Sequence, residues 1–163
     1  MQTVINSRDD VRQFYENLQF NINESPDKAV ELIKSNNAVE KIYPFPEDFY
    51  NSETVLELGC GAGWLSNMLA YYYGIKVVAV DFNKYAIEFG RKVSEILGIS
   101  QYVDFICKDL YCIDDASYDI VISNGVLHHT NDAVKGIRKC ASLTNMGGYC
   151  SLAYTINMPG SHF

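Results

Sequence analysis

Val55-Leu56-Glu57-Leu58-Gly59-Cys60-Gly61-Ala62-Gly63 is the stretch that decides the fold of this chain. A short apolar run leads into a turn with alternating glycines, and the next apolar run closes on Asp81. Glycine has no Cβ, so such a turn lets the backbone come close to a ligand. A carboxylate at the end of the following strand can accept hydrogen bonds from both hydroxyls of a ribose. The stretch therefore predicts a nucleoside-bearing ligand at the first strand-to-helix crossing of an α/β sheet.

Strand and helix patterns alternate outward from this stretch. Apolar runs predict strands at 54–58, 76–80, 102–107, 118–123 and 149–155, the last after a Gly147-Gly148 turn. Helices are predicted from Trp64 to Tyr73 before Gly74, from the N-cap Asn83 through Leu97 to Gly98, and after the N-cap Thr130 with Val134, Ile137 and Ala141 on one face. Near-continuous apolar strands suit a mostly parallel sheet covered on both faces. We therefore predict a doubly wound three-layer sandwich with strand order 3-2-1-4-5.

The first 50 residues differ from the rest and predict a helical cap. Val11, Phe14, Tyr15 and Leu18 recur at helical spacing. Ser25-Pro26 is typical of an N-cap followed by proline in the first helical turn, and Pro44 and Pro46 mark a loop. We predict a cap at 1–50 and a ligand-binding domain at 51–163.

Composition sets limits on partners and compartment. The 163 residues suffice for one domain, and the net charge of −7 opposes binding to the phosphate backbone of nucleic acid. The five cysteines include no Cys-x-x-Cys pair, which predicts reduced, mostly buried thiols in a cytoplasmic protein and no metal site. No signal peptide and no apolar run of about 18–20 residues is found, so no membrane association is predicted.

Two classes of cofactor compete for a glycine-rich turn followed by an acid. A dinucleotide oxidoreductase would use Gly-x-Gly-x-x-Gly, but its third glycine position holds Trp64. The alternative, Glu-x-Gly-x-Gly-x-Gly, is matched in full from Glu57 to Gly63. With this match, residues 54 to about 155 resemble the class I, Rossmann-like S-adenosylmethionine-dependent methyltransferases.

The resemblance implies a set of cofactor-binding residues. Asp81 would bind the ribose, Phe82 would lie against the adenine, and Asp109 and Leu110 in Cys107-Lys108-Asp109-Leu110 would meet the adenine ring and its amino group. At the methionine end it implies Glu57, Gly59, Gly61 and Gly63, backbone groups of Ser123 and Asn124, and Tyr15 in the cap, with Phe20 as a second aromatic candidate. Cys60 lies within the same turn, where a small filler is the simpler interpretation than a nucleophile.

A second resemblance follows the fourth predicted strand. Val126-Leu127-His128-His129 is similar to a segment that borders the acceptor pocket in small-molecule methyltransferases. If the acceptor is a hydroxyl, a base must remove its proton, and histidine suits this at neutral pH. The catalytic candidate is His128, while His129 can equally serve to pack or cap the following helix.

The predicted function is methyl transfer from S-adenosylmethionine to a small-molecule acceptor, leaving S-adenosylhomocysteine. The alternative is a non-catalytic S-adenosylmethionine-binding or regulatory subunit, and a weaker rival is a nicotinamide-dependent oxidoreductase. Related sheets have seven strands, whereas the chain ends at Phe163 soon after the fifth. An open fifth strand predicts a homodimer or a missing C-terminal region that covers this edge.

Overall fold

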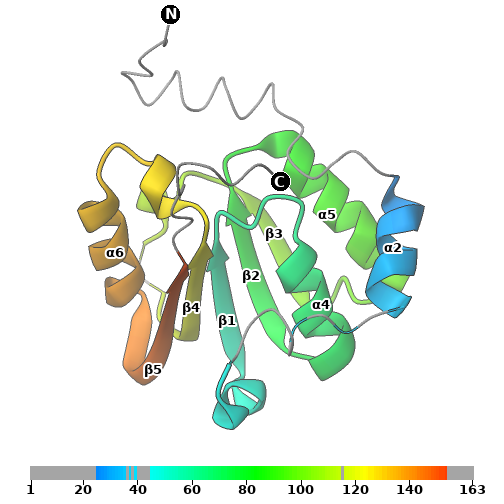
Figure 1. Ribbon diagram of the computed structural model, residues 1–163, viewed down its shortest axis with the longest axis horizontal. Helices are drawn as coiled ribbons and strands as arrows, with labels where there is room; N and C mark the ends of the chain where they lie inside the picture. Colours follow the sequence, from blue (N-terminus) through cyan, green and yellow to red (C-terminus); the bar gives the residue numbers. More distant parts are fainter. Residues whose placement is uncertain (1–24, 36, 38, 40–44, 115, 154–163) are drawn as a thin grey trace, which may run out of the picture.

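The structure, a computed structural model, describes residues 25–35, 37, 39, 45–114 and 116–153. Its elements run in the order α2 (Pro26–Ser35), the short 3₁₀ helix η1 (Glu47–Asn51), β1 (Thr54–Leu58), α4 (Trp64–Tyr73), β2 (Lys76–Asp81), α5 (Lys84–Leu97), β3 (Val103–Cys107), η2 (Leu110–Cys112), β4 (Tyr118–Asn124), η3 (Leu127–His129), α6 (Ala133–Ser142) and β5 (Thr144–Ala153), as Figure 1 shows. Within these ranges no helix has the length and apolar character that a membrane crossing requires.

The five strands form one sheet in which all neighbouring strands are parallel. Their order, β3-β2-β1-β4-β5, confirms the predicted doubly wound arrangement. Strand β1 is central, because Val55 pairs with Val77 of β2 on one side and with Ile120 of β4 on the other. The direction of winding reverses between β1 and β4, and ligands of open α/β sheets bind at the carboxyl ends of strands beside such a switch.

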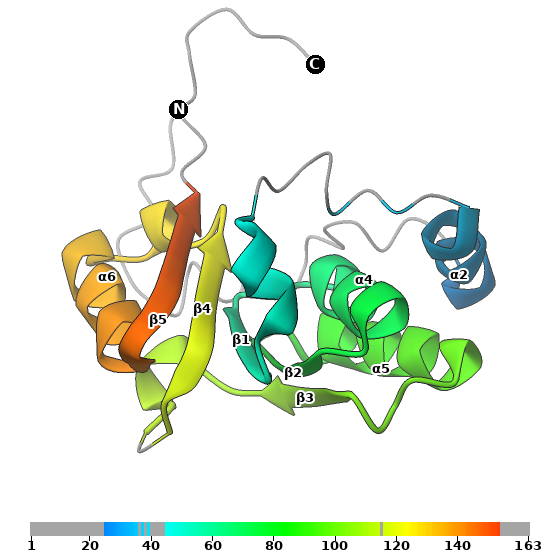
Figure 2. The ribbon, with the colours of Figure 1, turned by 90° about the horizontal axis from the view of Figure 1, so that it is seen from below.

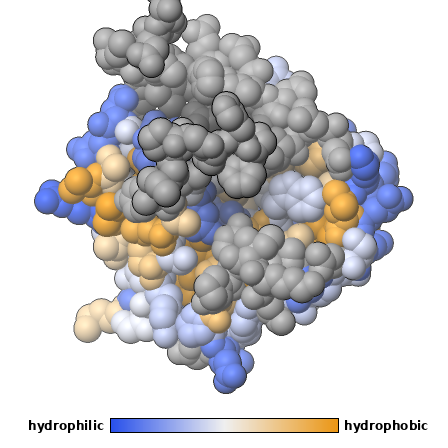
Figure 3. Space-filling view, in the orientation of Figure 1, coloured by the Kyte–Doolittle hydropathy of each residue, from blue (hydrophilic) through white to orange (hydrophobic). Residues whose placement is uncertain are grey.

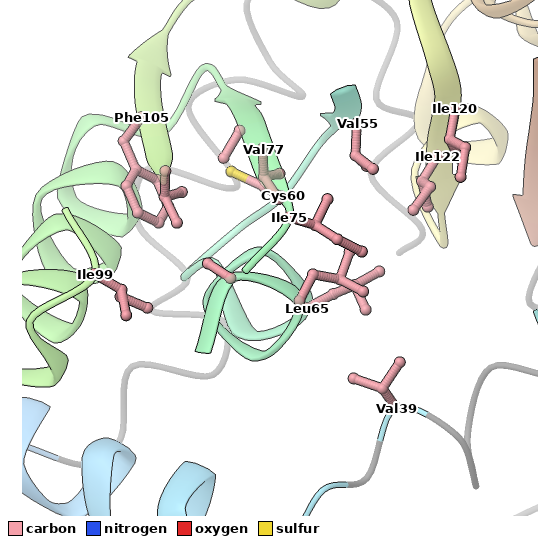
Figure 4. Packing of buried hydrophobic residues seen from close by; sticks show 14 of the residues in the cluster. Val39, Val55, Cys60, Leu65, Ile75, Val77, Ile99, Phe105, Ile120 and Ile122 are labelled. Atoms are coloured by element: carbon pink, nitrogen blue, oxygen red, sulfur yellow. The ribbon is translucent and has the colours of Figure 1, made fainter. Parts of the chain in front are cut away.

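Helices cover both faces of the sheet, as the two ribbon views show (Figures 1 and 2). Successive strand residues point to opposite faces, so each strand contributes to two cores. On the face covered by α4 and α5, Val55, Val77 and Ile122 pack in one buried cluster with Leu65 and Phe105 (Figure 4). On the α6 face, the cluster contains Leu56, Leu58, Val80, Ile113, Val121, Leu127, Cys140 and Leu143.

Helix α2 packs on the outside of α4 and α5 (Figure 2). It begins as predicted, with the backbone N–H of Lys28 donating to Ser25 Oγ at 3.3 Å. Its buried side chains, Ala29, Val30 and Ile33, contact Val93 of α5. Tyr15 and Phe20, the cap residues assigned to the cofactor, lie outside the described residues.

The helix after η3 begins later than predicted and turns a different face inward. Its N-cap is Asp132, whose Oδ1 accepts from the backbone N–H of Lys135 at 2.8 Å, whereas the Thr130 hydroxyl donates to the Leu127 carbonyl. The stripe of Val134, Ile137 and Ala141 is exposed, and Val134 keeps 58% of its surface. Apolar colour accordingly marks the α6 side of the molecule in Figure 3.

The buried face of α6 carries small residues. Gly136 and Cys140 point inward, and a Cβ on Gly136 would lie only 2.8 Å from Leu127 Cδ2. The helix therefore approaches the core too closely for large side chains, which explains why its branched residues face outward.

Strand β5 also begins earlier than predicted. Tyr118 already pairs with Thr144, and the register shifts before Ile120 pairs with Tyr149, so the two glycines lie inside an irregular strand. Asp119 accounts for this, because its Oδ1 accepts from the Asn145 amide at 3.0 Å and holds the early part of β5 against β4.

The prediction of mostly buried thiols is wrong. All five cysteines are free, but Cys107, Cys112 and Cys150 are exposed. Cys107 ends β3, Cys112 ends η2 and Cys150 lies in β5, and the average preference of cysteine for burial does not reveal their exposure.

Candidate functional site

The turn after β1 brings its glycines to the carboxyl end of the sheet with left-handed φ angles: +77° at Gly59, +53° at Gly61 and +72° at Gly63. A Cβ on Gly59 would lie 2.3 Å from Cγ2 of Val126. One on Gly63 would lie 2.4 Å from Cε1 of Phe105, whereas one on Gly61 would meet no atom of the described residues within 4 Å. Gly59 and Gly63 thus allow close packing, and Gly61 presents bare backbone to open space.

Hydrogen bonds fix this turn against β2. The backbone N–H groups of Gly59 and Cys60 both donate to the Val80 carbonyl, at 2.7 and 3.0 Å. The Cys60 thiol is buried and donates to the Gly61 carbonyl, and burial raises its pKa well above the ordinary value. A protonated, enclosed thiol fits the filler role and not that of a nucleophile.

Asp81 joins the turn to the start of α5. Its Oδ2 accepts from the Gly61 N–H at 2.9 Å, and its Oδ1 accepts from the Asn83 N–H at 2.8 Å. Burial is the main reason that the pKa of this carboxyl is raised, and the backbone hydrogen bonds oppose that effect. Each carboxylate oxygen can accept a further hydrogen bond. Asp81 therefore has the capacity to bind two hydroxyls while it holds the turn.

Glu57 lies beneath the turn, at the end of β1, and is buried. It accepts a short hydrogen bond from the Ser66 hydroxyl in the first turns of α4. Desolvation, the largest effect, raises its pKa from 4.5 to about 7, although the Ser66 hydrogen bonds lower it. A raised pKa means that the folded protein holds this proton more tightly than the unfolded chain does.

Because of the raised pKa of Glu57, we expect the free energy of unfolding to depend on pH, and we expect Glu57→Gln to remove this dependence. Between pH 4.5 and about 7 the folded state binds more protons at Glu57, so its free energy of unfolding should fall as the pH rises. The fall amounts to about 3 kcal/mol and levels off above the folded pKa. Urea unfolding across this window should give a flatter profile for Glu57→Gln. A constant difference between the two proteins at every pH would contradict the assignment.

The end of β3 lies beside the end of β2. The backbone N–H of Lys108 donates to the Asp81 carbonyl at 2.9 Å, and the Cys107 thiol lies 3.5 Å from the Phe82 carbonyl. Asp109 caps η2, with its Oδ1 accepting from the Tyr111 N–H. These contacts bring Phe82 and Asp109 to one corner of the sheet. The side chain of Leu110 packs against the core on the α6 face, so its contribution to a ligand site is limited to its backbone.

The end of β4 provides the other side of the site. Ser123 is buried, and its hydroxyl donates to the Leu58 carbonyl at 3.1 Å, so this side chain joins β4 to β1. Asn124 differs, because both polar atoms of its amide are buried without a hydrogen-bond partner among the described residues. A buried amide without a hydrogen-bond partner lowers the stability of the folded protein. The Asn124 amide is therefore suited to a ligand that both donates and accepts hydrogen bonds.

The two adjacent histidines are the last two residues of η3 (Leu127–His129), which follows β4 after Gly125 and Val126. Their ring centroids are 3.8 Å apart, and the planes are tilted by 46°. Desolvation is the main cause that lowers the pKa of His129, and the neighbouring His128 adds to it. Leu127 between them and the sheet is buried and anchors the segment. The histidines thus sit at the carboxyl edge of the sheet, as predicted.

Several residues that support the site were not predicted from the sequence. Ser66 binds Glu57, Val126 and Phe105 contact the turn glycines, and Asn83 shares the Asp81 carboxylate. The sequence identified Asn83 only as a helix cap and Val126 only as part of the histidine segment, and it gave no signal that Ser66 or Phe105 supports the site. The rival glycine position, Trp64, begins α4 and packs with α2. Among the described residues there is no group of three or more metal-binding side chains.

Comparison with known proteins matches residues 56–152 to a family described as a methyltransferase domain. A ubiquinone biosynthesis O-methyltransferase of Xanthomonas campestris pv. campestris (strain B100) is 35% identical over 112 residues, which are 67% of this chain and 45% of that protein. A protein of the same name from Coxiella burnetii (strain RSA 493 / Nine Mile phase I) is 31% identical over 96 residues, 58% of this chain and 40% of the relative. The chain thus spans less than half the length of these relatives.

Solved structures support the same fold. A S-adenosylmethionine-dependent methyltransferase from Thiobacillus denitrificans, solved in complex with S-adenosyl-L-homocysteine, superposes with a TM-score of 0.57 at 22% identity. The match covers 71% of this chain and 53% of that one. At this identity the likeness concerns the arrangement of helices and strands.

Proposed function

The chain belongs to the methyltransferase domain family, and from this premise we propose that it transfers a methyl group from S-adenosylmethionine to a small-molecule acceptor. The proposed cofactor residues are those of the sequence prediction, with the ribose at Asp81, the adenine at Phe82, Asp109 and the Leu110 backbone, and the methionine part along the glycine turn and the end of β4.

The contact between Asp81 and the glycine turn is the main support for this proposal. The Asp81 carboxylate holds the Gly61 N–H, and Gly61 is the turn glycine above which the described residues leave space. A ribose on Asp81 would therefore extend its 5′ side over bare backbone, where a methionine chain can pass without meeting a Cβ. The Asn124 amide, which has no partner among the residues that the structure describes, then suits an amino acid, whose ammonium donates and whose carboxylate accepts.

The chemistry asks little of the protein beyond alignment. The sulfonium is already an activated leaving group, so the acceptor atom attacks the methyl carbon in line while the bond to sulfur breaks. The chain's residues would orient the two partners and exclude water. An oxygen acceptor is favoured, since the curated relatives are named O-methyltransferases. His128 would then remove the hydroxyl proton.

Isothermal calorimetry with S-adenosylhomocysteine, NAD and NADP tests the cofactor. Binding of S-adenosylhomocysteine alone is expected. Binding of only the dinucleotides would overturn the proposal in favour of an oxidoreductase. The net charge of −7 does not attract the negatively charged pyrophosphate group of NAD or NADP.

Replacement of His128 is predicted to separate chemistry from binding. His128→Ala should slow methyl transfer by about 10²-fold, because an acceptor hydroxyl loses its base, and should leave the affinity for S-adenosylhomocysteine nearly unchanged. The rate is measured as S-adenosylhomocysteine release with a panel of small phenols, carboxylates and amines. His129→Ala is the matched control, since it removes the same ring-to-ring contact while leaving the His128 imidazole in place. Equal rates for His128→Ala and the unaltered chain would remove His128 from the mechanism.

A second candidate is a non-catalytic cofactor-binding or regulatory subunit. In that case the acceptor panel gives no turnover although S-adenosylhomocysteine binds.

We further propose that strand β5 is covered in the working protein by a second copy or by additional polypeptide. It is one of the two edge strands of the described sheet, and Thr144–Ala153 contains none of the charged residues or prolines that protect exposed edges. The proposal also includes a cap formed by residues 1–50, with Tyr15 at the methionine carboxylate. It further includes a cytoplasmic location, where the thiols stay reduced.

A further inference from the structure

Two cysteines meet at the contact between α6 and β5. Cys140 of α6 has no exposed surface and belongs to the core cluster that contains Val121. The β4–β5 register pairs Cys150 with Val121, so Cys150 stands on the same face of the sheet. Leu152, two residues further along β5, packs against that cluster as well. The two thiols lie close enough for each to shift the pKa of the other.

The two sulfur atoms differ in exposure and in acidity. Cys150 is exposed and Cys140 is buried. The hydrogen bond from Cys140 is the main cause that lowers the pKa of Cys150 to about 7, and the Thr144 hydroxyl adds to it against the effect of burial. The same hydrogen bond raises the pKa of Cys140. An accessible thiolate beside a protected thiol has the arrangement of an attacking and a resolving cysteine.

We propose that Cys150 and Cys140 form a peroxide-reactive dithiol that closes a disulfide between β5 and α6. The Cys150 thiolate attacks one peroxide oxygen, the O–O bond breaks, and hydroxide leaves a sulfenic acid on Cys150. The Cys140 thiol then loses its proton and attacks that sulfur, the S–O bond breaks, and the oxygen departs as water. Two thiols and one hydrogen peroxide give one disulfide and two waters, with two electrons passing from sulfur to oxygen.

The other cysteines do not offer this arrangement. Cys60 is enclosed by the glycine turn, and the Cys107 thiol is directed to the Phe82 carbonyl. Pairing of another strand with the β5 edge uses backbone groups, whereas the Cys150 side chain stands on the α6 face. Coverage of the edge is therefore compatible with reaction at this sulfur.

The disulfide would join the two elements that flank the histidine segment. The Gly125 N–H donates to the Ala153 carbonyl of β5 at 2.9 Å, and Asp132 caps α6 at the other end of the segment. The cross-link would therefore restrain both supports of residues 125–132, which include the proposed base.

The experiment treats the folded full chain with equimolar hydrogen peroxide at neutral pH, alkylates the remaining thiols and digests with trypsin. Residues 140–163 contain no lysine or arginine, so both cysteines fall in one peptide. That peptide should carry no label and be lighter by two hydrogen atoms, while the other three cysteines are alkylated. Chymotryptic cleavage after Tyr149 should leave its two halves joined.

Variants and a rate measurement complete the test. Cys140→Ser should leave Cys150 as a sulfenic acid that dimedone traps, and Cys112→Ser should form the disulfide as the unaltered chain does. Iodoacetamide should label Cys150 about 5-fold faster than N-acetylcysteine at pH 6.5, given the larger thiolate fraction and weaker nucleophilicity. Full alkylation of the 140–163 peptide after peroxide treatment, or faster oxidation of Cys107 or Cys112, would overturn the proposal.

Discussion

Gly63→Ala should lower the free energy of unfolding by about 2–5 kcal/mol, the sum of a left-handed backbone and an overpacked core. The φ of Gly63 is +72°, and its new Cβ would lie 2.4 Å from Cε1 of Phe105. The ring has little room to move, because Gly90 of α5 packs against it so closely that a Cβ there would lie 2.6 Å from the same carbon. Urea denaturation followed by circular dichroism measures the loss.

Gly74→Ala is the matched control for this substitution. Gly74 ends α4 with a φ of +65°, but a Cβ there would meet no described atom within 4 Å. It should therefore cost only the backbone part, about 1–2 kcal/mol. Adding Phe105→Leu to Gly63→Ala should recover part of the extra loss, as a positive coupling in a double-mutant cycle. Equal losses at Gly63 and Gly74 would show that the ring contact has no energetic weight.

Asp81→Ala should weaken the binding of S-adenosylhomocysteine by about 3 kcal/mol, which is more than 10²-fold. Two hydrogen bonds from ribose hydroxyls to a carboxylate, at about 1.5 kcal/mol each, account for this figure. The Gly61 and Asn83 N–H groups also lose their acceptor, so the turn is less well ordered before the ligand arrives. Calorimetry on a variant whose circular dichroism matches that of the unaltered chain gives the affinity.

Asp119→Ala is the control for the loss of a structural aspartate. Asp119 accepts from the Thr54 hydroxyl at 2.9 Å and from the Asn145 amide at 3.0 Å, at the amino ends of β1 and β5. It lies at the opposite edge of the sheet from the glycine turn, so its removal should lower stability and leave ligand affinity unchanged. If both variants lost affinity equally, the effect of Asp81 would be one of folding and not of contact with the ribose.

Local patterns predicted most of the fold because they depend on neighbours in the chain. The strand Thr54–Leu58 and the helix Trp64–Tyr73 have their predicted bounds, and Asn83 caps α5 through contacts with Tyr85 and Ala86. The sheet order followed from the alternation of strands and helices. These features require only hydrophobic period, capping chemistry and the handedness of crossovers.

The errors arise where distant residues decide the outcome. Helical spacing grouped Val134, Ile137 and Ala141 correctly on one face, but the close approach of α6 to Leu127 turned the small residues inward instead. Asp132, and not Thr130, caps α6, because its carboxylate accepts from the Lys135 N–H, while the Thr130 hydroxyl donates to the Leu127 carbonyl. The early start of β5 depends on Asp119, which is 26 residues from Asn145.

The candidate site divides in the same way. Motif spacing found the glycines and Asp81, and the hydrogen bond from Gly61 to Asp81 brings these two parts together. Motif spacing could not reveal that Glu57 is enclosed with Ser66 or that Ser123 is directed to Leu58. Nor could it reveal that the Asn124 amide has no hydrogen-bond partner within the described part of the chain. Such assignments depend on burial, which is a property of the folded chain.

The aromatic ring of Phe105, enclosed by Gly63 and Gly90, has a consequence for how this sequence can diverge. The residue type at position 63 is limited by Phe105 of β3, whereas the residue type at position 61 is limited by the ligand proposed to lie over Gly61. A smaller side chain at position 105 would relieve the ring contact at both glycines, while the left-handed φ at Gly63 and the Ala62 carbonyl 2.9 Å from a Cβ on Gly90 would still disfavour replacing them. Substitutions at positions 63, 90 and 105 should therefore be correlated among related sequences. A motif search that requires every glycine would overlook relatives in which both the ring and a glycine have been lost.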